Sequence, residues 1–254
     1  MYRKRFTIGD IHGNYKGLLQ VMERSGFQPE HDLLISLGDV VDGHSETPQV
    51  VEHLLSLPNL IAIRGNHDSR WGALDWFENA VANPHWVRQG GQATIDAYTE
   101  FFTENPDKKE AHIKFFKYQH DYYVDDDNNV FIHGGIYPMF GTVQQMSNRQ
   151  DMYWDRNMWE RAMVLQYYME NGKEEYVTNI LPKCFREHNN IFIGHTHVDS
   201  DTVNPQALPV RAMNVWNIDT GAGYSGKLTI MDIDTHEYWQ SDFATDLYTD
   251  YKGR

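Results

Sequence analysis

An apolar run leads directly into an acidic loop in the stretch Leu33-Leu34-Ile35-Ser36-Leu37-Gly38-Asp39-Val40-Val41-Asp42-Gly43. The residues before Gly38 have the length and composition of a buried β-strand, and a glycine lets the backbone turn sharply where the strand ends. Asp39 would then lie at the carboxyl end of a strand, which is where α/β folds build their functional sites. A strand that ends in a His, Asp or Asn side chain is therefore the unit to search for along the chain.

Four other apolar runs lead into loops whose side chains can bind metals or move protons. These loops are Gly9-Asp10-Ile11-His12-Gly13, Gly65-Asn66-His67-Asp68, His133-Gly134-Gly135 and Gly194-His195-Thr196-His197. A lone Asp or Asn after a strand is more often a turn residue, and a lone His is more often hydrogen-bonded or solvated. Five such loops in one chain, each at a strand end, favour a shared site over five separate turns.

Short apolar runs alternate with amphipathic stretches along the chain, which predicts an α/β fold with helices covering a mixed sheet or a pair of packed sheets. Expected strands cover residues 6–8, 33–37, 60–63, 130–132, 191–193, 215–218, 228–233 and 238–241, and expected helices cover 14–24, 47–57, 73–79, 93–102, 109–118 and 158–169. Thr47 is the expected cap of the second helix, with Pro48 in its first turn. The acidic stretch 125–129 is the expected loop of a β-hairpin. No repeat or linker divides residues 1–254, so we expect a single domain.

Composition excludes several classes of protein. The 254 residues are 41% hydrophobic and 23% charged, which is ordinary for a globular protein. The 36 acidic and 22 basic residues give a formal net charge of -14, which is unlike a protein that binds a nucleic-acid duplex. The apolar runs are far shorter than the roughly 20 residues of a membrane span, and residues 1–8 lack the apolar stretch of a secretory leader. We therefore expect a cytoplasmic protein that binds neither nucleic-acid duplexes nor membranes.

The five loops together carry a donor set for transition metals. Asp10 and His12 are two residues apart, so an extended segment points both side chains the same way. Asp39 has two carboxylate oxygens that can bridge two ions. The other donors are an amide oxygen and three imidazoles, from Asn66, His133, His195 and His197. This set of N and O ligands suits Mn, Fe, Zn, Co or Ni and is too large for one ion, so it predicts two adjacent metals. The single cysteine, Cys184, excludes a thiolate cluster.

The ordered motifs resemble those of the calcineurin-like metallophosphoesterases, and within them the bacterial and phage serine/threonine protein phosphatases. GDxHG, GDxxD, GNH(E/D), HGG and GHTx occupy residues 9–197 in the family's order, with further similarity in residues 90–94, 153–156, 217–222 and 226–229. The resemblance therefore covers nearly the whole chain. It implies a catalytic domain with two packed mixed β-sheets flanked by helices, and a dinuclear metal site at the carboxyl ends of strands.

The resemblance also implies roles for individual residues. One ion would be held by Asp10, His12 and Asp39, and a second ion, bridged by Asp39, would be held by Asn66, His133 and His195. Many of these phosphatases lack a histidine at the position of His197, but in the wider superfamily a histidine there completes the first ion's ligands, so His197 is also expected to bind metal. The ions would activate a water for in-line attack at phosphorus. His67, held by Asp42, would protonate the leaving group.

Phosphate binding is where the chain departs from the family pattern. These phosphatases usually continue GDxxD with Arg-Gly, and that arginine holds phosphate oxygens, whereas Gly43-His44 follows Asp42 here. Arg156 matches another phosphate-binding arginine of the bacterial pattern, and Arg70 could compensate for the missing one. His44 is a candidate substrate contact, although a solvated loop histidine is the more common case.

Aromatic residues carry less information about the site. Trp71, Trp76, Trp154, Trp159 and Trp216 are candidates for a substrate groove, but packing is the default role of such residues. Tyr224 lies near the position of a site tyrosine of the family.

The expected activity is metal-dependent hydrolysis of phosphate monoesters, on serine, threonine or tyrosine phosphoproteins or on small phosphoesters, with manganese favoured among Mn, Fe, Zn, Ni and Co. The alternative is a dinucleoside tetraphosphate hydrolase, because that related family also carries GNHD and lacks the GDxxDRG arginine. A phosphodiesterase or nuclease is disfavoured by the net charge of -14. A metal-stabilised binding module without activity would be marked by a broken ligand set or the loss of His67, and the sequence has neither feature.

Overall fold

Two mixed five-stranded β-sheets form the centre of the computed structural model, which describes residues 2–137, 141–198 and 202–249. The first sheet has the order β10-β9-β1-β2-β3 and the second has the order β4-β5-β6-β8-β7. The first consists of β1 (Arg5–Ile8), β2 (Leu33–Ser36), β3 (Leu60–Ala62), β9 (Thr229–Asp232) and β10 (Tyr238–Gln240), and the second of β4 (Tyr122–Val124), β5 (Val130–Ile132), β6 (Ile191–Ile193), β7 (Val210–Ala212) and β8 (Val215–Asn217). In each sheet three parallel strands lie side by side and antiparallel strands complete the sheet. The predicted fold class is confirmed.

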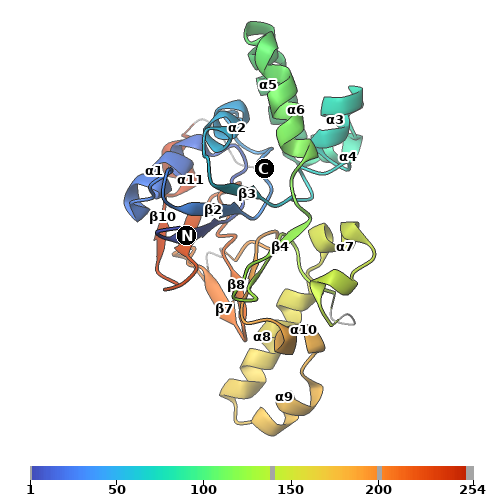
Figure 1. Cartoon of the computed structure of the whole chain (residues 1–254), viewed down its shortest axis with the longest axis vertical. Helices are drawn as coiled ribbons and strands as arrows, with labels where there is room; N and C mark the ends of the chain where they lie inside the picture. Colours follow the sequence, from blue (N-terminus) through green and yellow to red (C-terminus); the bar gives the residue numbers. More distant parts are fainter. Residues whose placement is uncertain (1, 138–140, 199–201, 250–254) are drawn as a thin grey trace.

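Helices flank the sheets and extend to opposite ends of the molecule (Figure 1). The first group consists of α1 (Tyr15–Ser25), α2 (Thr47–Leu55), α3 (Ala73–Asn79), α4 (Pro84–Trp86), α5 (Gln92–Glu104), α6 (Lys109–Lys117) and α11 (Ala244–Leu247). The second group consists of α7 (Arg149–Trp154), α8 (Asn157–Glu170), α9 (Glu174–Ile180) and α10 (Lys183–Glu187). Helix α1 packs on β9 and β10, and α8 packs on β7 and β8, so each sheet has its own helical cover. The α5–α6 pair extends from one end and α9 lies at the other.

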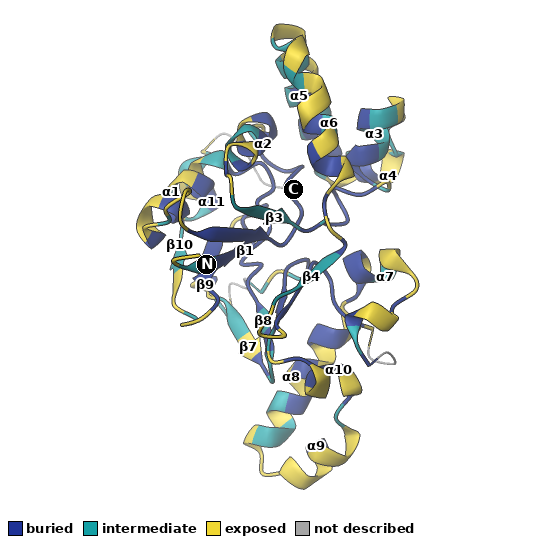
Figure 2. Cartoon of the chain, in the orientation of Figure 1, coloured by how far each residue is buried: buried dark blue, intermediate teal, exposed yellow. Residues whose placement is uncertain are grey.

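The core has three layers because the central strands are buried on both faces. Leu33 and Ile35 of β2 pack between the sheets, whereas Leu34 faces the helices of the first group. Between the sheets, Phe131 of β5 and Phe192 of β6 are register neighbours, and their rings stack with centroids 5.0 Å apart. Figure 2 shows the resulting contrast between buried strands and the exposed outer faces of α5 and α9. Burial of both faces explains why these strands read as continuous apolar runs.

Short elements account for most differences from the sequence-based expectation. The eight predicted strands and six predicted helices are present, with ends shifted by up to two residues. Strand β4 was implied only as the first arm of the expected hairpin, and strand β7 and helices α4, α7, α9, α10 and α11 were not predicted. None of these exceeds seven residues, and elements this short carry little periodicity.

Two local expectations had different outcomes. The loop 125–129 is a hairpin turn, in which Asp125 Oδ1 accepts the backbone N–H groups of Asp127 (3.0 Å) and Asn129 (2.8 Å). The assignment of Thr47 as a helix cap was wrong, because α2 begins at Thr47 itself and its capping residue, Glu46, makes no side-chain capping bond.

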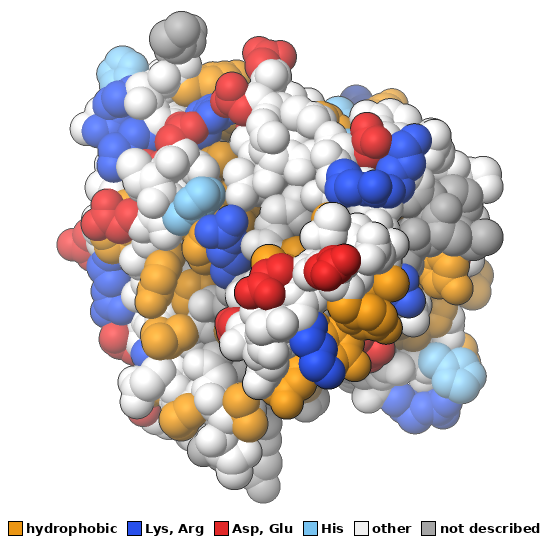
Figure 3. Space-filling view, turned by 90° about the horizontal axis from the view of Figure 1, so that it is seen from below, with side chains coloured by type: hydrophobic (Ala, Val, Ile, Leu, Met, Phe, Trp, Pro, Cys, Tyr) orange, Lys and Arg blue, Asp and Glu red, His pale blue; other side chains and the backbone are white. Residues whose placement is uncertain are grey.

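The surface shows acidic, basic and hydrophobic side chains interspersed when the molecule is seen from the end that carries α8 and α9 (Figure 3). Large apolar side chains exposed on these two helices include Val164, Tyr167 and Tyr176. In the described part of the chain, no helix is both long enough and apolar enough to cross a bilayer.

A buried carboxylate ties the loop after β2 to the loop after β3. Asp68 Oδ1 accepts the backbone N–H of Val40 (3.0 Å), and Asp68 Oδ2 accepts the N–H of Gly65 (3.2 Å) and the side-chain amide of Gln119 (3.0 Å). Burial, together with the nearby Asp39, raises the pKa of Asp68 to about 6. Asp68 therefore fixes the relative position of two of the loops identified from the sequence.

We expect Asp68→Ala to lower the free energy of unfolding by about 3 kcal/mol, because several buried donors lose their acceptor. Urea unfolding of metal-stripped protein measures this change without a contribution from bound metal. Asp96→Ala is the matched control, because Asp96 is exposed on α5, where it accepts a hydrogen bond from Gln92. Equal stability of the two variants would contradict the role given to Asp68.

Candidate active site

A cavity of about 110 Å³ lies where loops from both sheets converge. The parallel strands β1, β2 and β3 of one sheet and β5, β6 and β8 of the other end near this point, as expected for sites at the carboxyl ends of strands. The cavity is lined by Asp10, His12, Asp39, Asn66, His67, Gln89, Trp154, Arg156, His195, His197, Asp219 and Tyr224. Four of the five loops singled out from the sequence contribute to this lining. The fifth contributes His133, which lies against the same carboxylates.

Two groups of buried donors share one residue. The ligand atoms of Asp10, His12 and Asp39 lie within 4.8 Å of one another, and so do those of Asp39, His133 and His195. All five side chains are buried. Asp39 therefore belongs to both groups, which is the arrangement that two neighbouring cations sharing one carboxylate would require.

The histidines are oriented as metal ligands are. The Nδ1 atoms of His12 and His133 each lie 2.8 Å from a backbone carbonyl oxygen, of residues 41 and 37 respectively. A carbonyl can only accept, so each Nδ1 carries a hydrogen, which leaves Nε2 as the ring nitrogen that a metal ion would take. These Nε2 atoms lie 3.7 and 3.4 Å from Asp39 Oδ2. His195 Nε2 is buried and has no hydrogen-bond partner among the described residues.

The electrostatics of the site also favour cations. Burial, with Asp219 nearby, raises the pKa of Asp10 well above its usual range. Burial acts on Asp39 in the same direction, but His133 and His67 outweigh it and lower the pKa of Asp39 well below its usual range. In turn, the Asp39 and Asp10 carboxylates overcome the effect of burial and raise the pKa of His133 to about 10. Closely spaced buried carboxylates of this kind need positive charge, which divalent metal ions would supply.

Three of the donor residues have backbone conformations that are unusual for residues with a side chain. Asp39, His12 and His195 have φ values of 46°, 50° and 66°, in the left-handed region. The loops also pack closely: a Cβ on Gly65 would lie 2.0 Å from Asp39 Oδ1, and one on Gly194 would lie 2.0 Å from Asp10 Oδ1. Strain and close approach at one place are typical of functional sites, and they explain why glycine precedes Asn66 and His195.

His67 and Asn66 are held by the same network. The His67 backbone N–H donates to Asp39 Oδ1 at 2.9 Å, and His67 Nδ1 lies 2.5 Å from Asp42 Oδ2. Asn66 Oδ1 lies 3.0 Å from His133 Nε2. Asn66 is thus next to the second donor group, and His67 has the buried carboxylate partner expected from the sequence.

The predicted phosphate-binding arginines have different surroundings. Arg156 lines the cavity, and its guanidinium donates to the His195 carbonyl (3.2 Å) and to Thr196 Oγ1 (3.0 Å). Arg70 does not line the cavity. It is exposed and forms an ion pair with Glu78 at 2.6 Å. The structure therefore brings only Arg156 of the two to the other predicted residues.

The structure places two further histidines considered from the sequence, His197 at the cavity and His44 in the interior. His197 lines the cavity and is exposed, with its ring 5.0 Å from that of Tyr224. It belongs to neither of the two donor groups. His44 is neither solvated nor exposed to substrate, because it is buried with Nε2 2.9 Å from the Ala222 carbonyl oxygen and its ring stacked on Tyr248 at 4.2 Å.

Four lining residues lie outside the predicted catalytic, metal-binding and phosphate-binding set: Gln89, Trp154, Asp219 and Tyr224. Trp154 was considered from the sequence only as a groove candidate, and Tyr224 only for its position near a site tyrosine of the family. Asp219 lies in the tail 217–222 and Trp154 in the segment 153–156, both of which carry family similarity. That similarity was the available signal for these two. Gln89 had none, because it comes from an irregular helical turn, Val87–Gly91.

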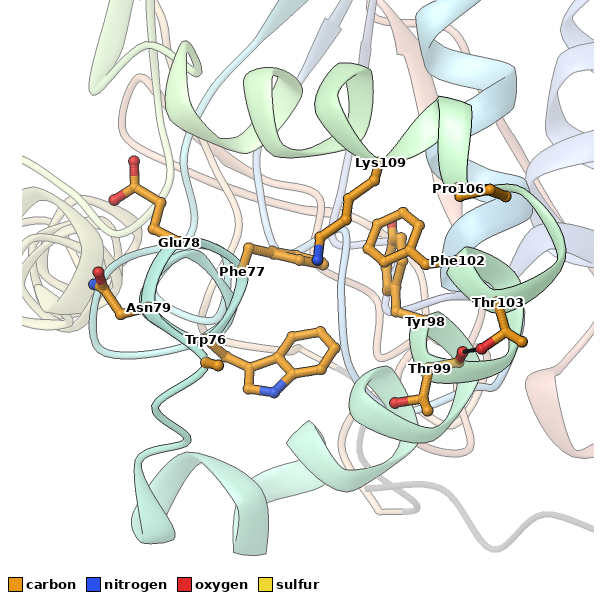
Figure 4. A pocket seen from close by; sticks show the side chains of 11 residues that line it. Trp76, Phe77, Glu78, Asn79, Tyr98, Thr99, Phe102, Thr103, Pro106 and Lys109 are labelled. Atoms are coloured by element: carbon orange, nitrogen blue, oxygen red, sulfur yellow. Dashed lines mark hydrogen bonds between the residues drawn. The ribbon is translucent and has the colours of Figure 1, made fainter.

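A larger cleft, of about 630 Å³, lies between α3 and the α5–α6 pair. Figure 4 shows the aromatic side chains of Trp76, Phe77, Tyr98 and Phe102 around it, with Lys109 directed between them. Trp76 was a candidate for a substrate groove, but the described residues that line this cleft include no predicted catalytic, metal-binding or phosphate-binding residue and no member of the two donor groups. Volume alone is therefore no guide to the site, because the buried Asp and His side chains line the smaller cavity.

Comparisons with known proteins agree with this geometry. Serine/threonine-protein phosphatase 2 of Escherichia coli K12 is 27% identical over 237 residues, which cover 91% of this chain and 94% of the relative. A symmetrical bis(5'-nucleosyl)-tetraphosphatase of Buchnera aphidicola is 28% identical over 137 residues, 53% of this chain and 45% of the relative. A cold-active protein-tyrosine phosphatase of a psychrophilic Shewanella shares the fold, with a TM-score of 0.57 and 14% identity over 95% of this chain and 81% of its own. The sequence model of the calcineurin-like phosphoesterases matches residues 6–199. The chain therefore belongs to the calcineurin-like phosphoesterase family, hydrolases that act on phosphoester bonds.

Proposed function

We propose that this hydrolase removes phosphate from phosphomonoesters, with phosphoserine, phosphothreonine or phosphotyrosine proteins as its substrates. The observation that carries the proposal is the position of Asp39, which belongs to both donor groups while its Oδ1 accepts the backbone N–H of His67. A metal pair and a proton donor would therefore face one small cavity. We also propose that residues 1–254 form one catalytic domain, because both sheets contribute to this cavity.

The metal ligands in this proposal are Asp10, His12, Asp39, Asn66, His133, His195 and His197. Divalent ions at these positions would supply an activated water and neutralise charge on the phosphoryl oxygens. Manganese is the first choice, and iron, zinc, nickel and cobalt suit the same donor set.

The chain's own residues would complete the reaction. Arg156 would hold a phosphoryl oxygen at the edge of the cavity, since a guanidinium matches phosphate geometry. His67 would donate a proton to the departing alkoxide, with Asp42 holding its ring. The rest of the substrate would lie at the mouth, beside the half-exposed Trp154.

Hydrolysis of dinucleoside tetraphosphates is the second candidate, supported by the tetraphosphatase relatives. Two observations favour the phosphomonoester. The first is that the full-length identity to protein phosphatases, 27% and 25%, is higher than the 22% identity to a full-length tetraphosphatase. In addition, among the described residues Arg156 is the only Arg or Lys that lines the cavity, whereas a tetraphosphate chain carries several charges to be neutralised.

The test begins with hydrolysis of p-nitrophenyl phosphate by chelator-stripped protein supplied separately with Mn²⁺, Ni²⁺, Co²⁺, Zn²⁺ or Mg²⁺. Metal-dependent turnover with about two ions per chain supports the proposed chemistry. Phosphopeptides and diadenosine tetraphosphate are then compared by kcat/KM. Faster turnover of the tetraphosphate would overturn the substrate assignment, and absence of turnover on every ester would overturn the activity.

We expect Asp39→Asn to reduce bound metal from about two ions to one or none per chain, because it removes the carboxylate that both donor groups share. Metal analysis after gel filtration measures the loss independently of activity. Asp96→Asn on the exposed face of α5 is the control. Two ions retained by Asp39→Asn would contradict the shared role of Asp39.

We expect His67→Asn to cut turnover of a phosphoserine peptide by about 10²- to 10⁴-fold, the usual worth of a general acid. The loss on p-nitrophenyl phosphate should be much smaller, because nitrophenolate leaves without protonation. Steady-state kinetics on both substrates, at matched metal content, measure the difference. Equal losses would show that His67 does not protonate the leaving group.

A further inference from the structure

The carboxylate of Asp42 accepts hydrogen bonds from three side chains. His67 Nδ1 and Trp86 Nε1 lie 2.5 and 2.6 Å from Oδ2, and Thr94 Oγ1 lies 2.7 Å from Oδ1. The Thr94 hydroxyl also accepts the backbone N–H of Asp42 at 2.9 Å. None of the four residues is more than 1% exposed. Asp42 is thus enclosed by protein donors on both carboxylate oxygens, with no access for water to replace them.

The chemistry of these donors fixes the direction of each bond. An indole N–H can only donate, so Asp42 Oδ2 accepts from Trp86. The Thr94 oxygen accepts from the Asp42 N–H, which leaves its own hydrogen for Oδ1. The Asp42 carboxylate therefore accepts in all three side-chain contacts, and His67 donates from Nδ1. Under the proposed function, the other ring nitrogen, Nε2, is the one that would donate to a leaving group.

The backbone of Asp42 needs this support. Its φ is 72°, in the left-handed region that a residue with a side chain adopts at a cost. Thr94 bonds to both the N–H and the carboxylate of Asp42, so it holds this conformation and the side-chain direction together. A change in either would move Oδ2 and, with it, the His67 ring.

Both supporting residues come from one segment, which runs from α4 through α5 and contributes only Gln89 to the cavity lining. The segment contains Gly90-Gly91-Gln92-Ala93-Thr94, which the sequence singled out without a role. Gly91 lies so close to the Trp86 indole that a Cβ there would be 2.5 Å from ring atom Cε2. The motif thus seats the indole and presents the Thr94 hydroxyl to the same carboxylate.

We propose that Trp86 and Thr94 are positioning residues, which hold Asp42 so that His67 is aimed for proton donation. The inference rests on the proposed function, in which His67 is the general acid. It assigns a role in the reaction to a helical segment that lies outside the five motif loops and contains none of the proposed metal ligands.

The test compares Trp86→Phe and Thr94→Val on a series of phosphate esters, from p-nitrophenyl phosphate through phenyl phosphate to a phosphoserine peptide. We expect each variant to lose about 10-fold in kcat on the peptide, the order of magnitude seen when a partner of a site histidine is removed. The loss on p-nitrophenyl phosphate should be less than about 2-fold, since that leaving group depends least on the acid. The dependence of rate on leaving group is the decisive readout, because a smaller active fraction lowers all rates equally.

Matched variants separate positioning from folding. Thr94→Ser keeps the hydroxyl and should retain the wild-type leaving-group dependence. Tyr98→Phe removes another buried hydrogen bond of α5, to His112, without touching Asp42, and should do the same. Bound metal and the thermal midpoint are measured for every variant. A uniform loss on all esters by Trp86→Phe and Thr94→Val, or no loss, would overturn the inference.

Variants that carry His67→Asn separate a failure of this inference from a failure of the proposed function on which it rests. With His67 absent, Trp86→Phe should cause no further change in leaving-group dependence, since coupled residues are not additive. If His67→Asn itself leaves the dependence unchanged, the general-acid assignment fails. If His67→Asn steepens the dependence but Trp86→Phe and Thr94→Val do not, only the positioning role fails.

Discussion

The buried carboxylate of Asp39 is the constraint around which the site is organised. Its backbone carbonyl accepts the N–H groups of Ile11 and His12, at 3.1 and 2.9 Å, and its Oδ1 accepts the N–H of His67 at 2.9 Å. One residue thus joins the loops after β1, β2 and β3. A buried carboxylate needs compensation from polar or charged neighbours, and the loops that supply it must converge on one point. The two-sheet architecture meets this need by ending parallel strands of both sheets at that point.

The surroundings of Asp39 and Asp42 differ in kind. Asp39 faces imidazole nitrogens and other carboxylates, an arrangement suited to cations, whereas Asp42 faces N–H and O–H donors, an arrangement suited to a fixed anion. The two carboxylates belong to one motif and are three residues apart. Their different environments come from different parts of the chain, since β5 and β6 lead to the histidines near Asp39 and the α4–α5 segment supplies the donors to Asp42.

Much of the fold could be predicted from the sequence because its central strands are buried on both faces. Such strands read as apolar runs whatever their neighbours are, and the donor residues follow them directly. The short helices and the edge strand β7 could not be found in this way. Their three to seven residues carry too little pattern, and their positions depend on packing against the finished sheets.

For the candidate site, the amino-acid sequence by itself determined which donor types follow the strands, and therefore the family and the prediction that Asp39 is shared by two donor groups. Only the tertiary structure decided which of two arginines borders the cavity and that His44 packs against Tyr248 in the interior. It also decided that Trp86 and Thr94 enclose Asp42. The physical reason is separation along the chain: Trp86 is 44 residues from Asp42 and Thr94 is 52. Local spacing sets the direction of neighbouring side chains, whereas contacts across such separations exist only once the sheets and helices have packed.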